Sequence, residues 1–172
     1  MPKAPYCAHG YFCTAPRPAR RRPAIDGLAV AAFDQFKDAY ADWPLFKQNI
    51  GAMSALSAHG EIIVAQQGAR LVGAVAYIGP QQPKSAMFDP AWPIMRMLVV
   101  APEARGIGVG RALALACIAR ARRDKAAVFA LHTSELMAVA LPMYQRMGFA
   151  WHAAAPSIHG VAYGIYLKQL EA

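Results

Sequence analysis

The sequence is poor in cysteine, and its three cysteines are unevenly spaced. Cys7, Cys13 and Cys117 form neither a paired pattern nor the closely spaced ligand set of a zinc site. We therefore expect no disulfide framework and no metal. Cys117 lies in an apolar helical stretch and is predicted to be a small buried hydrophobic residue. This use of cysteine favours a reducing, cytoplasmic setting.

Long apolar runs are also missing from the sequence. No stretch approaches the roughly 18 residues that a membrane-spanning helix needs. Yet 56% of the 172 residues are hydrophobic, which is enough for a sizeable core and argues against disorder. A chain of this length is typical of one domain. We expect a soluble single-domain protein with no membrane partner.

The first 22 residues contain no aspartate or glutamate. Their basic residues supply +5 of the chain's formal charge of +8, and are Lys3, Arg17, Arg20, Arg21 and Arg22. We predict a basic N-terminal extension over 1–22 and a folded domain over 23–172. Such an end is typically solvated and loose. A basic tail can also bind nucleic acid, but no motif or aromatic platform supports that partner. An export signal is not expected, because no apolar stretch follows the arginines.

Periodicity and turn residues predict a mixed order of helices and strands. Asp26 is interpreted as the N-cap of a first helix, which Trp43-Pro44 ends before a second helix follows. Strands are expected at 61–65, 71–78, 94–100, 127–132, 149–152 and 161–167, with later helices at 111–123 and 134–147. Gly73 indicates a bulge or a close backbone approach. The predicted fold class is α/β, one mixed central sheet flanked by helices.

The most informative segment is the junction between the strand 94–100 and the helix that follows it. Glycines stand at 106, 108 and 110, directly before Arg111. Glycine tolerates positive φ, and a helix N-terminus offers unpaired amide donors. These features favour a pyrophosphate site with Arg105 and Arg111 as charged neighbours, and a simple tight turn is the alternative. The spacing fits neither a P-loop nor the dinucleotide fingerprint Gly-x-Gly-x-x-Gly.

Two segments of the sequence resemble the GNAT superfamily of acetyltransferases. Arg105-Gly106-Ile107-Gly108-Val109-Gly110 satisfies its Arg/Gln-x-x-Gly-x-Gly/Ala signature. Leu141-Pro142-Met143-Tyr144-Gln145-Arg146-Met147-Gly148-Phe149 is similar to its Leu-Tyr-x-x-x-Gly-Phe block. The clear resemblance covers residues 94–149. It implies a GNAT-like fold with acetyl-CoA as cosubstrate, held in a β–loop–α unit where two parallel strands splay.

The resemblance also implies roles for individual residues. Backbone groups of Leu98 and Val100, with Val99 between them, would hold the acetyl carbonyl and the pantetheine arm. The amides of 105–110 and the start of the helix at Arg111 would bind the pyrophosphate. Tyr144 matches the family's tyrosine near the CoA sulfur, where a phenol would protonate the leaving thiolate. The alternative for Tyr144 is a core aromatic residue whose hydroxyl finds another partner.

Two positions depart from the family pattern and leave the general base open. The strand before the loop reads Trp92-Pro93-Ile94-Met95-Arg96, without the glutamate of many relatives, and Met137 stands where many have asparagine. Water relayed to solvent, an acid from elsewhere, or His132 could serve; a structural role for His132 is the alternative. Pro142 would either kink the helix that carries Tyr144 or mark a break in it.

The expected activity is direct attack of a primary amine on the acetyl thioester, with Tyr144 as general acid. The first two helices and the loop 79–93, which holds four prolines but few charges, are expected to shape the acceptor site. This favours a small, partly apolar acceptor, while lysine side chains and protein N-termini stay open. A non-catalytic acyl-CoA sensor is a second hypothesis, because the glutamate is missing. A homodimer is left open.

Overall fold

The computed structural model describes residues 6–7, 11–14 and 18–170, with side chains from Arg22 onward. In chain order the elements are β1 (Tyr6–Cys7), β2 (Tyr11–Thr14), α1 (Pro18–Phe33), α2 (Trp43–Ile50), β3 (Glu61–Gln67), β4 (Arg70–Ile78), β5 (Ile94–Val100), α3 (Val109–Arg123), β6 (Val128–Thr133), α4 (Ala140–Arg146), β7 (Ala150–Ile158) and β8 (Val161–Gln169). Short 3₁₀ helices occupy Asp34–Ala39, Met53–Ala58 and Pro102–Ala104. None of the described helices has the length and apolarity that crossing a bilayer requires.

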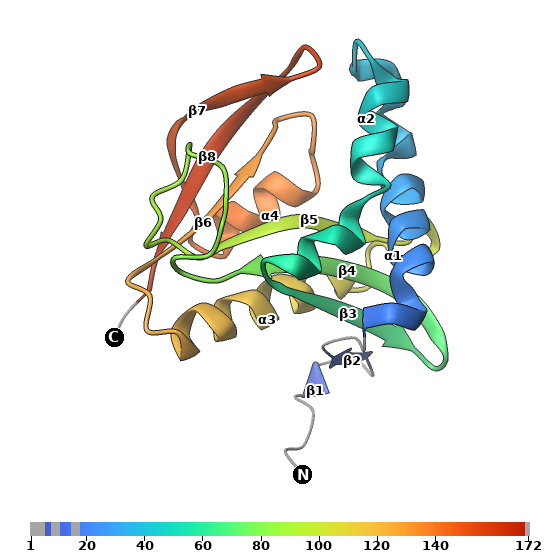
Figure 1. Cartoon of the computed structure of the whole chain (residues 1–172), viewed down its shortest axis with the longest axis horizontal. Coiled ribbons are helices and arrows are strands. Elements are labelled where there is room, and N and C mark those ends of the chain that lie inside the picture. Colours follow the sequence, from blue (N-terminus) through green and yellow to red (C-terminus); the bar gives the residue numbers. More distant parts are fainter. Residues whose placement is uncertain (1–5, 8–10, 15–17, 171–172) are drawn as a thin grey trace.

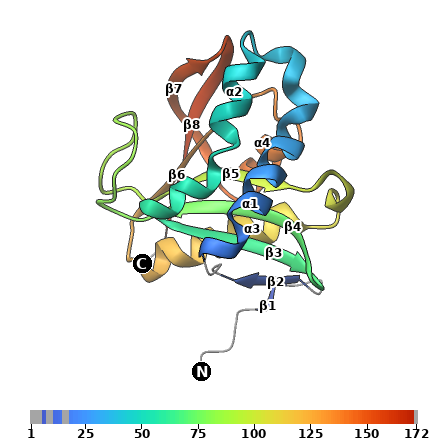
Figure 2. The same ribbon diagram turned by 45° about the vertical axis from the view of Figure 1, so that its right-hand side comes forward.

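The described strands form one sheet in the order β1-β2-β3-β4-β5-β6-β8-β7. Neighbouring strands are antiparallel except for β5 and β6, which are parallel. Helices α1 and α2 cover one face of the sheet, and α3 lies across the other (Figure 1, Figure 2). The predicted mixed sheet flanked by helices is confirmed.

Apolar side chains fill both layers between the sheet and its helices. Successive residues of a strand point to opposite faces, so Val75 packs toward α3 while Ala74 and Ala76 pack toward α1 and α2. The α3 layer includes Cys117, which is fully buried as predicted. Burial also raises the pKa of its thiol, so the residue is an unreactive part of the core.

Gly73 lies where β4 meets the first turn of α3. A Cβ at this position would come within 2.8 Å of Val109 Cγ1 and 2.9 Å of Leu113 Cδ1. The register of β3 against β4 also shifts between Ala65 and Gln66, opposite Gly73. Both features that the sequence predicted for Gly73, a bulge and a close approach, are therefore present. The close approach seats α3 and its preceding loop on the sheet.

The first helix begins earlier than the sequence predicts. α1 starts at Pro18, and the expected domain boundary between residues 22 and 23 lies within it. Asp26 is therefore not an N-cap, and that prediction was wrong. Its carboxylate accepts hydrogen bonds from the backbone N–H of Ser54 at 2.7 Å and from the Ser54 hydroxyl at 2.8 Å. A partner far along the chain, which local patterns do not reveal, satisfies this polar residue.

The last helix begins later than the sequence predicts. α4 starts at Ala140, while the Ser134 hydroxyl accepts a hydrogen bond from the Leu136 N–H at 3.2 Å in the turn before it. Pro142 therefore lies in the first turn of α4. Backbone N–H groups there have no intrahelical acceptor, so proline, which lacks an N–H, costs the helix no hydrogen bond. It neither kinks nor breaks α4. Gly148, with a φ of +89°, ends the segment as predicted.

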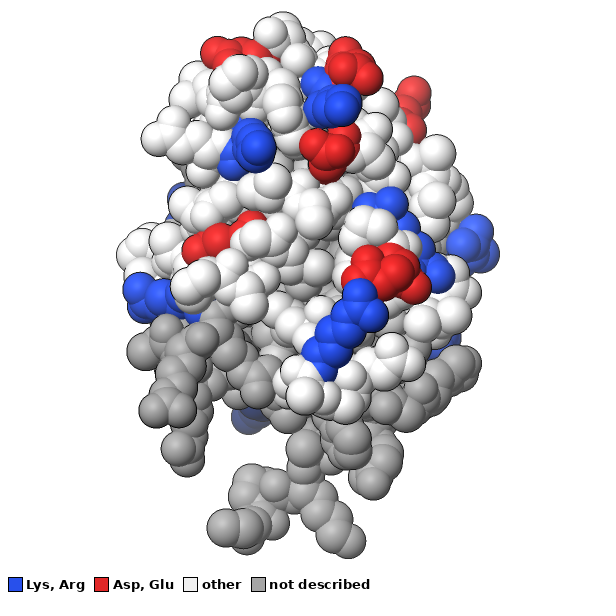
Figure 3. Space-filling view, turned by 90° about the vertical axis from the view of Figure 1, so that its right-hand side faces the viewer, with Lys and Arg blue, Asp and Glu red and all other residues white. Residues whose placement is uncertain are grey.

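Charged side chains of both signs are interspersed on the face of the molecule seen in Figure 3. The lysines and arginines among the described residues of that face do not form a broad continuous basic patch. A surface that binds the phosphate backbone of nucleic acid is typically basic over a continuous area. This face therefore offers no support for a nucleic-acid partner.

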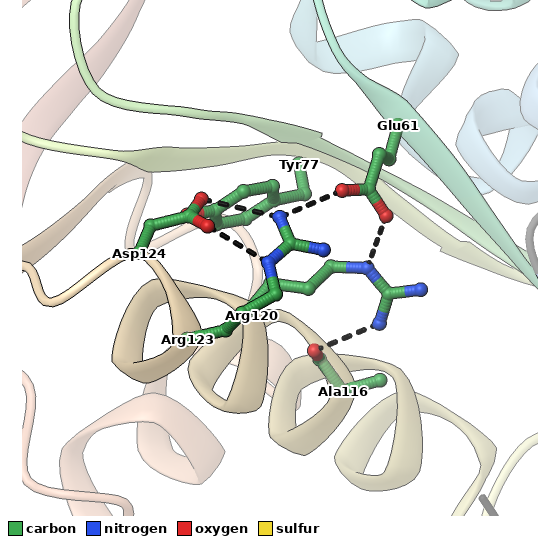
Figure 4. Close-up of polar contacts among 6 residues, drawn as sticks. All are labelled: Glu61, Tyr77, Ala116, Arg120, Arg123 and Asp124. Carbon is green, nitrogen blue, oxygen red and sulfur yellow. Dashed lines mark hydrogen bonds and ion pairs between the residues drawn. The ribbon is translucent and has the colours of Figure 1, made fainter. Parts of the chain in front are cut away.

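A cluster of ion pairs fastens the end of α3 to β3 and β4 (Figure 4). Glu61 accepts hydrogen bonds from Arg120 Nε at 2.6 Å and from Arg123 Nη2 at 2.8 Å. Arg123 also pairs with Asp124, whose Oδ2 accepts a hydrogen bond from the Tyr77 hydroxyl at 2.7 Å. Burial alone would raise the pKa of Glu61, but the hydrogen bonds from the two arginines outweigh it and the pKa is lowered. The hydrogen bond from Arg123 likewise lowers the pKa of Asp124.

We predict that Glu61→Gln lowers the melting temperature by about 2–4 °C near neutral pH, corresponding to roughly 1 kcal/mol. A carboxyl with a lowered folded-state pKa stabilises the fold above its unfolded pKa, and this contribution is lost as the pH falls through the folded pKa. The wild type should therefore lose more stability than the variant between about pH 6 and pH 3. Thermal unfolding followed by circular dichroism measures this, with the exposed Glu135→Gln as control. Parallel pH profiles for wild type and Glu61→Gln would contradict the prediction.

Candidate active site

The two parallel strands, β5 and β6, meet at one end and then separate (Figure 1). Ile94 pairs with Ala130, and the Ala130 N–H donates to the Pro93 carbonyl at 3.0 Å. Beyond this point β5 continues to pair with β4, and β6 pairs along its length with β8. Each strand therefore has its hydrogen-bonding partner on its outer side. A cavity between them is lined by Leu98 of β5 and Thr133 of β6.

The backbone of β5 is strained beside this gap. Met97 has a φ of +56°, and the register of β4 against β5 shifts nearby. Positive φ in a non-glycine residue costs energy, and such strain gathers at functional sites. The Val99 side chain is buried toward α1 and α2, whereas Leu98 and Val100 are half-buried and border Gly110. Of the three residues predicted to bind the cofactor arm, Leu98 and Val100 thus lie toward the start of α3, and the Val99 side chain faces the other side of the sheet.

The glycine-rich loop before α3 is open to a ligand. Gly106 and Gly108 have φ values of +79° and +89°, and a Cβ at either position would meet nothing within 4 Å. Val109 packs into the core, and the Ala112 N–H donates to the Gly108 carbonyl at 3.0 Å. The amides before Ala112 have no intrahelical acceptor and lie at the positive end of the helix dipole. The loop therefore fits a pyrophosphate group.

The two arginines of this segment have different surroundings. Arg111 is exposed in the first turn of α3, and Ile107 is exposed in the loop. Arg105 instead contacts the end of α1, where its guanidinium donates to the Ala32 carbonyl at 3.0 Å and to Gln35 Oε1 at 3.3 Å. Of the two predicted neighbours of a pyrophosphate, Arg111 is thus exposed beside the loop. Arg105 ties the loop to α1.

Tyr144 lines the cavity from α4. Its side chain is 6% exposed and packs edge-on against Phe149, with ring centroids 6.0 Å apart. Burial raises the pKa of the phenol, and the neighbouring Cys117 adds to the effect. The hydroxyl therefore keeps its proton at neutral pH. A protonated phenol at the gap suits a proton donor, which is the role predicted for Tyr144.

One cavity of about 340 Å³ continues from the gap to the space beneath α1 and α2. The helices contribute Phe33, Phe46, Asn49 and Ile50 to its lining, and β8 contributes Tyr163. A mostly apolar wall with a few polar groups is typical of a small-molecule site. The loop 79–93, expected to shape the acceptor site, contributes none of the described lining residues. Its Phe88 instead packs against the ring of a lining residue, His132.

Successive side chains of β5 and β6 point to opposite faces of the sheet, and this alternation gives the cavity two different sides. Met95 and Leu131 lie with Tyr144 in the core layer on the α3 side. The next residue on each strand, Arg96 and His132, therefore faces the side of α1 and α2. The phenol thus lies on one side of the sheet, and a cation and an imidazole lie on the other.

His132 packs between two aromatic rings inside this wall. Its ring centroid lies 5.9 Å from that of Phe88 and 5.4 Å from that of Tyr163. Its buried Nδ1 has no hydrogen-bond partner among the described residues. Burial and, second, the charge of Arg96 lower the pKa of His132 to about 4. The imidazole is neutral at neutral pH and holds a proton far more weakly than an alkylamine does.

The turn between β7 and β8 is joined to the helices that line the cavity. The Ala41 N–H donates to the His159 carbonyl at 2.8 Å. The hydroxyls of Tyr40 and Tyr163 hydrogen-bond at 2.6 Å, and Phe46 packs against the His159 ring with centroids 5.9 Å apart. Two walls of the cavity, from distant parts of the chain, are therefore fastened to each other.

The wall under α1 and α2, where the first two helices were expected to shape an acceptor site, contains most of the lining residues that the sequence analysis did not single out. Phe33, Phe46 and Asn49 come from the helices, and Tyr163 comes from the last strand. No short motif connects these elements. Arg96 gave a signal that could have been used, because it is the one charged residue in the strand Ile94–Val100.

The match to a known family is extensive. The pattern described as the acetyltransferase (GNAT) family matches residues 26–149, well over half of the chain. This range includes both the glycine-rich loop and the Tyr144 block. No curated protein matches the sequence.

Several solved structures are similar to this chain. PH1933 from Pyrococcus horikoshii superposes with a TM-score of 0.75 at 13% identity, covering 94% of this chain and 99% of that protein. An acetyltransferase from Streptococcus agalactiae gives a TM-score of 0.69 at 19% identity, with the same coverage of 94% and 99%. A GNAT family acetyltransferase from Elizabethkingia anophelis, with acetyl-CoA bound, gives a TM-score of 0.64 at 16% identity, again covering 94% and 99%. At these identities the likeness shows the fold, and with the family match over residues 26–149 we conclude that the chain belongs to the acetyltransferase (GNAT) family.

Proposed function

We propose that this chain is an N-acetyltransferase that moves an acetyl group from acetyl-CoA to a primary amine on a small molecule. The observation that carries the proposal is the gap between β5 and β6, which joins the Tyr144 side to the cavity under α1 and α2. Family membership supports acyl transfer in general. The acetyl-CoA bound to the Elizabethkingia anophelis relative supports acetyl-CoA as the cosubstrate.

The groups around the gap fit this cosubstrate. The open glycine loop and the first amides of α3 would hold the pyrophosphate, with Arg111 beside them. The edge of β5 at Leu98 and Val100 would align the thioester arm with the gap. Acetyl-CoA supplies an electrophilic carbonyl and a thiolate leaving group. Tyr144 lines the gap from the opposite wall.

The transfer requires that one proton be given and one be taken. The lone pair of an uncharged amine forms the new N–C bond, and the C–S bond breaks. The Tyr144 hydroxyl gives its proton to the departing sulfur. The nitrogen then loses one proton, which returns to Tyr144 or leaves through water. A pKa of about 4 makes His132 a weak acceptor, and this supports water as the carrier.

The shape of the cavity favours a small acceptor over a lysine side chain or an N-terminus of a protein. Its volume of about 340 Å³ lies near the lower end of small-molecule sites. The contact between Ala41 and His159 joins the helices to the β7–β8 turn beside it. A polypeptide acceptor would need an extended groove at this place.

A non-catalytic acyl-CoA sensor is the second candidate. The observation in its favour is that no aspartate or glutamate occurs among the described residues lining the cavity. The protonated phenol of Tyr144 at the gap favours catalysis instead. Turnover decides between these two functions.

Tyr144→Phe should lower kcat about 100-fold or more and leave acetyl-CoA affinity unchanged, because the ring stays in place and only the proton donor is lost. Thiol release from acetyl-CoA, measured across a panel of amines, amino acids and peptides, gives kcat, and calorimetry gives the affinity. Tyr166→Phe is the matched control, since Tyr166 is a buried tyrosine of the same core layer. Equal turnover for Tyr144→Phe and wild type would remove Tyr144 from the chemistry. Acetyl-CoA binding without turnover on any acceptor would favour the sensor.

Gly108→Glu should weaken acetyl-CoA binding about tenfold or more, equivalent to roughly 1.4 kcal/mol. The new carboxylate would occupy the positive end of α3 and repel the pyrophosphate, and a φ of +89° disfavours any side chain. Gly68→Glu makes the same change at a φ of +60° in the β3–β4 turn, also with nothing within 4 Å. Isothermal titration calorimetry compares the two variants. Equal losses would show that backbone strain, rather than the loop's position, weakens binding.

The rise of kcat/KM with pH should follow deprotonation of the acceptor amine rather than of His132. With a pKa of about 4, His132 is already neutral above roughly pH 5, so its titration lies below the working range. For two acceptors whose amines differ in pKa, the acidic limbs of the kcat/KM–pH profiles should have midpoints that differ by the same number of pH units. His132→Gln should keep the limb of each acceptor where it was. If the midpoint of the acidic limb stayed the same when the acceptor changed, the titrating group would belong to the enzyme.

A further inference from the structure

Arg96 brings a positive charge to the cavity without a protein carboxylate to balance it. The ion pairs within the described part of the chain involve Arg70, Arg120 and Arg123. The lining residues that the structure describes include neither aspartate nor glutamate. Arg96 is half-buried on β5 and lines the cavity on the side of α1 and α2. Its charge therefore faces the space where an acceptor would bind.

Keeping such a cation in an apolar wall is costly unless a partner compensates it. Burial lowers the pKa of Arg96, which reflects this cost, although a guanidinium stays protonated in proteins. The neighbouring His132 is neutral and cannot supply a negative charge. The partner that fits best is an anionic group on the molecule that enters the cavity.

We propose that Arg96 binds a carboxylate on the acceptor, so that the acceptor is an amino acid or a similar small amine that carries a carboxylate near its amino group. The inference rests on the proposed function, because it names the substrate class of the same site. A guanidinium presents paired N–H donors that match a carboxylate in geometry as well as charge. Held in this way, the acceptor would direct its amine toward the gap and Tyr144.

The same charge works against other kinds of acceptor. A polyamine or a lysine-rich peptide would bring further positive charge next to Arg96, and no described lining carboxylate would offset it. The cation also disfavours the ammonium form of a bound amine, and so favours the uncharged nucleophile. The remaining wall, which includes Phe33, Phe46 and Ile158, suits an apolar or aromatic side chain.

Matched sets of acceptors test this inference. Each set contains an amino acid, its uncharged carboxamide and the decarboxylated amine: L-phenylalanine, L-phenylalaninamide and 2-phenylethylamine, and the same three forms of L-leucine. Wild type should favour the carboxylate form by at least about 30-fold in kcat/KM, compared at the same fraction of free amine. In Arg96→Met this preference should fall to near unity, and in Arg96→Lys part of it should remain. Arg122→Met, at an exposed arginine near the end of α3, is the control for loss of charge.

Binding separates a failure of this inference from a failure of the proposed function. Calorimetry in the presence of CoA compares the three forms on wild type and Arg96→Met, and melting curves show that both are folded. If binding depended on the carboxylate and on Arg96 but no acceptor was acetylated, the result would contradict the acetyltransferase proposal and support the anion site. Equal acetylation of all three forms, unchanged in Arg96→Met, would overturn the inference and leave the acetyltransferase standing. The absence of both carboxylate-dependent binding and carboxylate-dependent turnover would also overturn it.

Discussion

The separation of β5 from β6 is the constraint on which the rest of the site depends. Ile94 and Ala130 still hold the two strands together at one end, and beyond them each strand hydrogen-bonds to its outer neighbour. A continuous parallel pairing would seal the sheet at Leu98 and Thr133. The separation instead leaves backbone groups on the inner edges that need a partner, since unpaired polar backbone is costly when buried. A ligand arm that lies along β5 can supply that partner.

The alternation of side chains along the two strands divides the site into two halves. Met95 and Leu131 belong to the layer that contains Tyr144, while Arg96 and His132 face α1 and α2. The Tyr144 phenol and the Arg96 cation therefore line one cavity from opposite faces of the sheet. In the proposed reaction the gap is the route by which acetyl-CoA and the acceptor, one from each face, would reach a common point. Arg105 adds a link between the halves, because it joins the glycine loop to the end of α1.

The sequence predicted the features that local geometry decides. Gly73, Gly148 and the glycine loop were found because positive φ or close packing restricts the residue type at each position. Asp26 was misjudged because its partner is Ser54, on a segment that only the folded chain brings near. The first two helices were expected to border an acceptor site, but the individual residues of that wall were missed for the same reason, since it assembles from both helices, β5 and the last strand. No single segment of the sequence contains enough of its residues to predict this wall.

The cavity's electrostatics follow from this assembly. The strand that supplies Arg96 is otherwise apolar, and the elements packed over it supply aromatic side chains instead of acids. In an environment of low effective dielectric constant an unpaired charge acts strongly on its neighbours, and the charge of Arg96 adds to the effect of burial in lowering the pKa of His132. The same field acts on whatever enters. In the proposed complex, the charge that binds an anionic group of the acceptor would also favour the uncharged form of its amine.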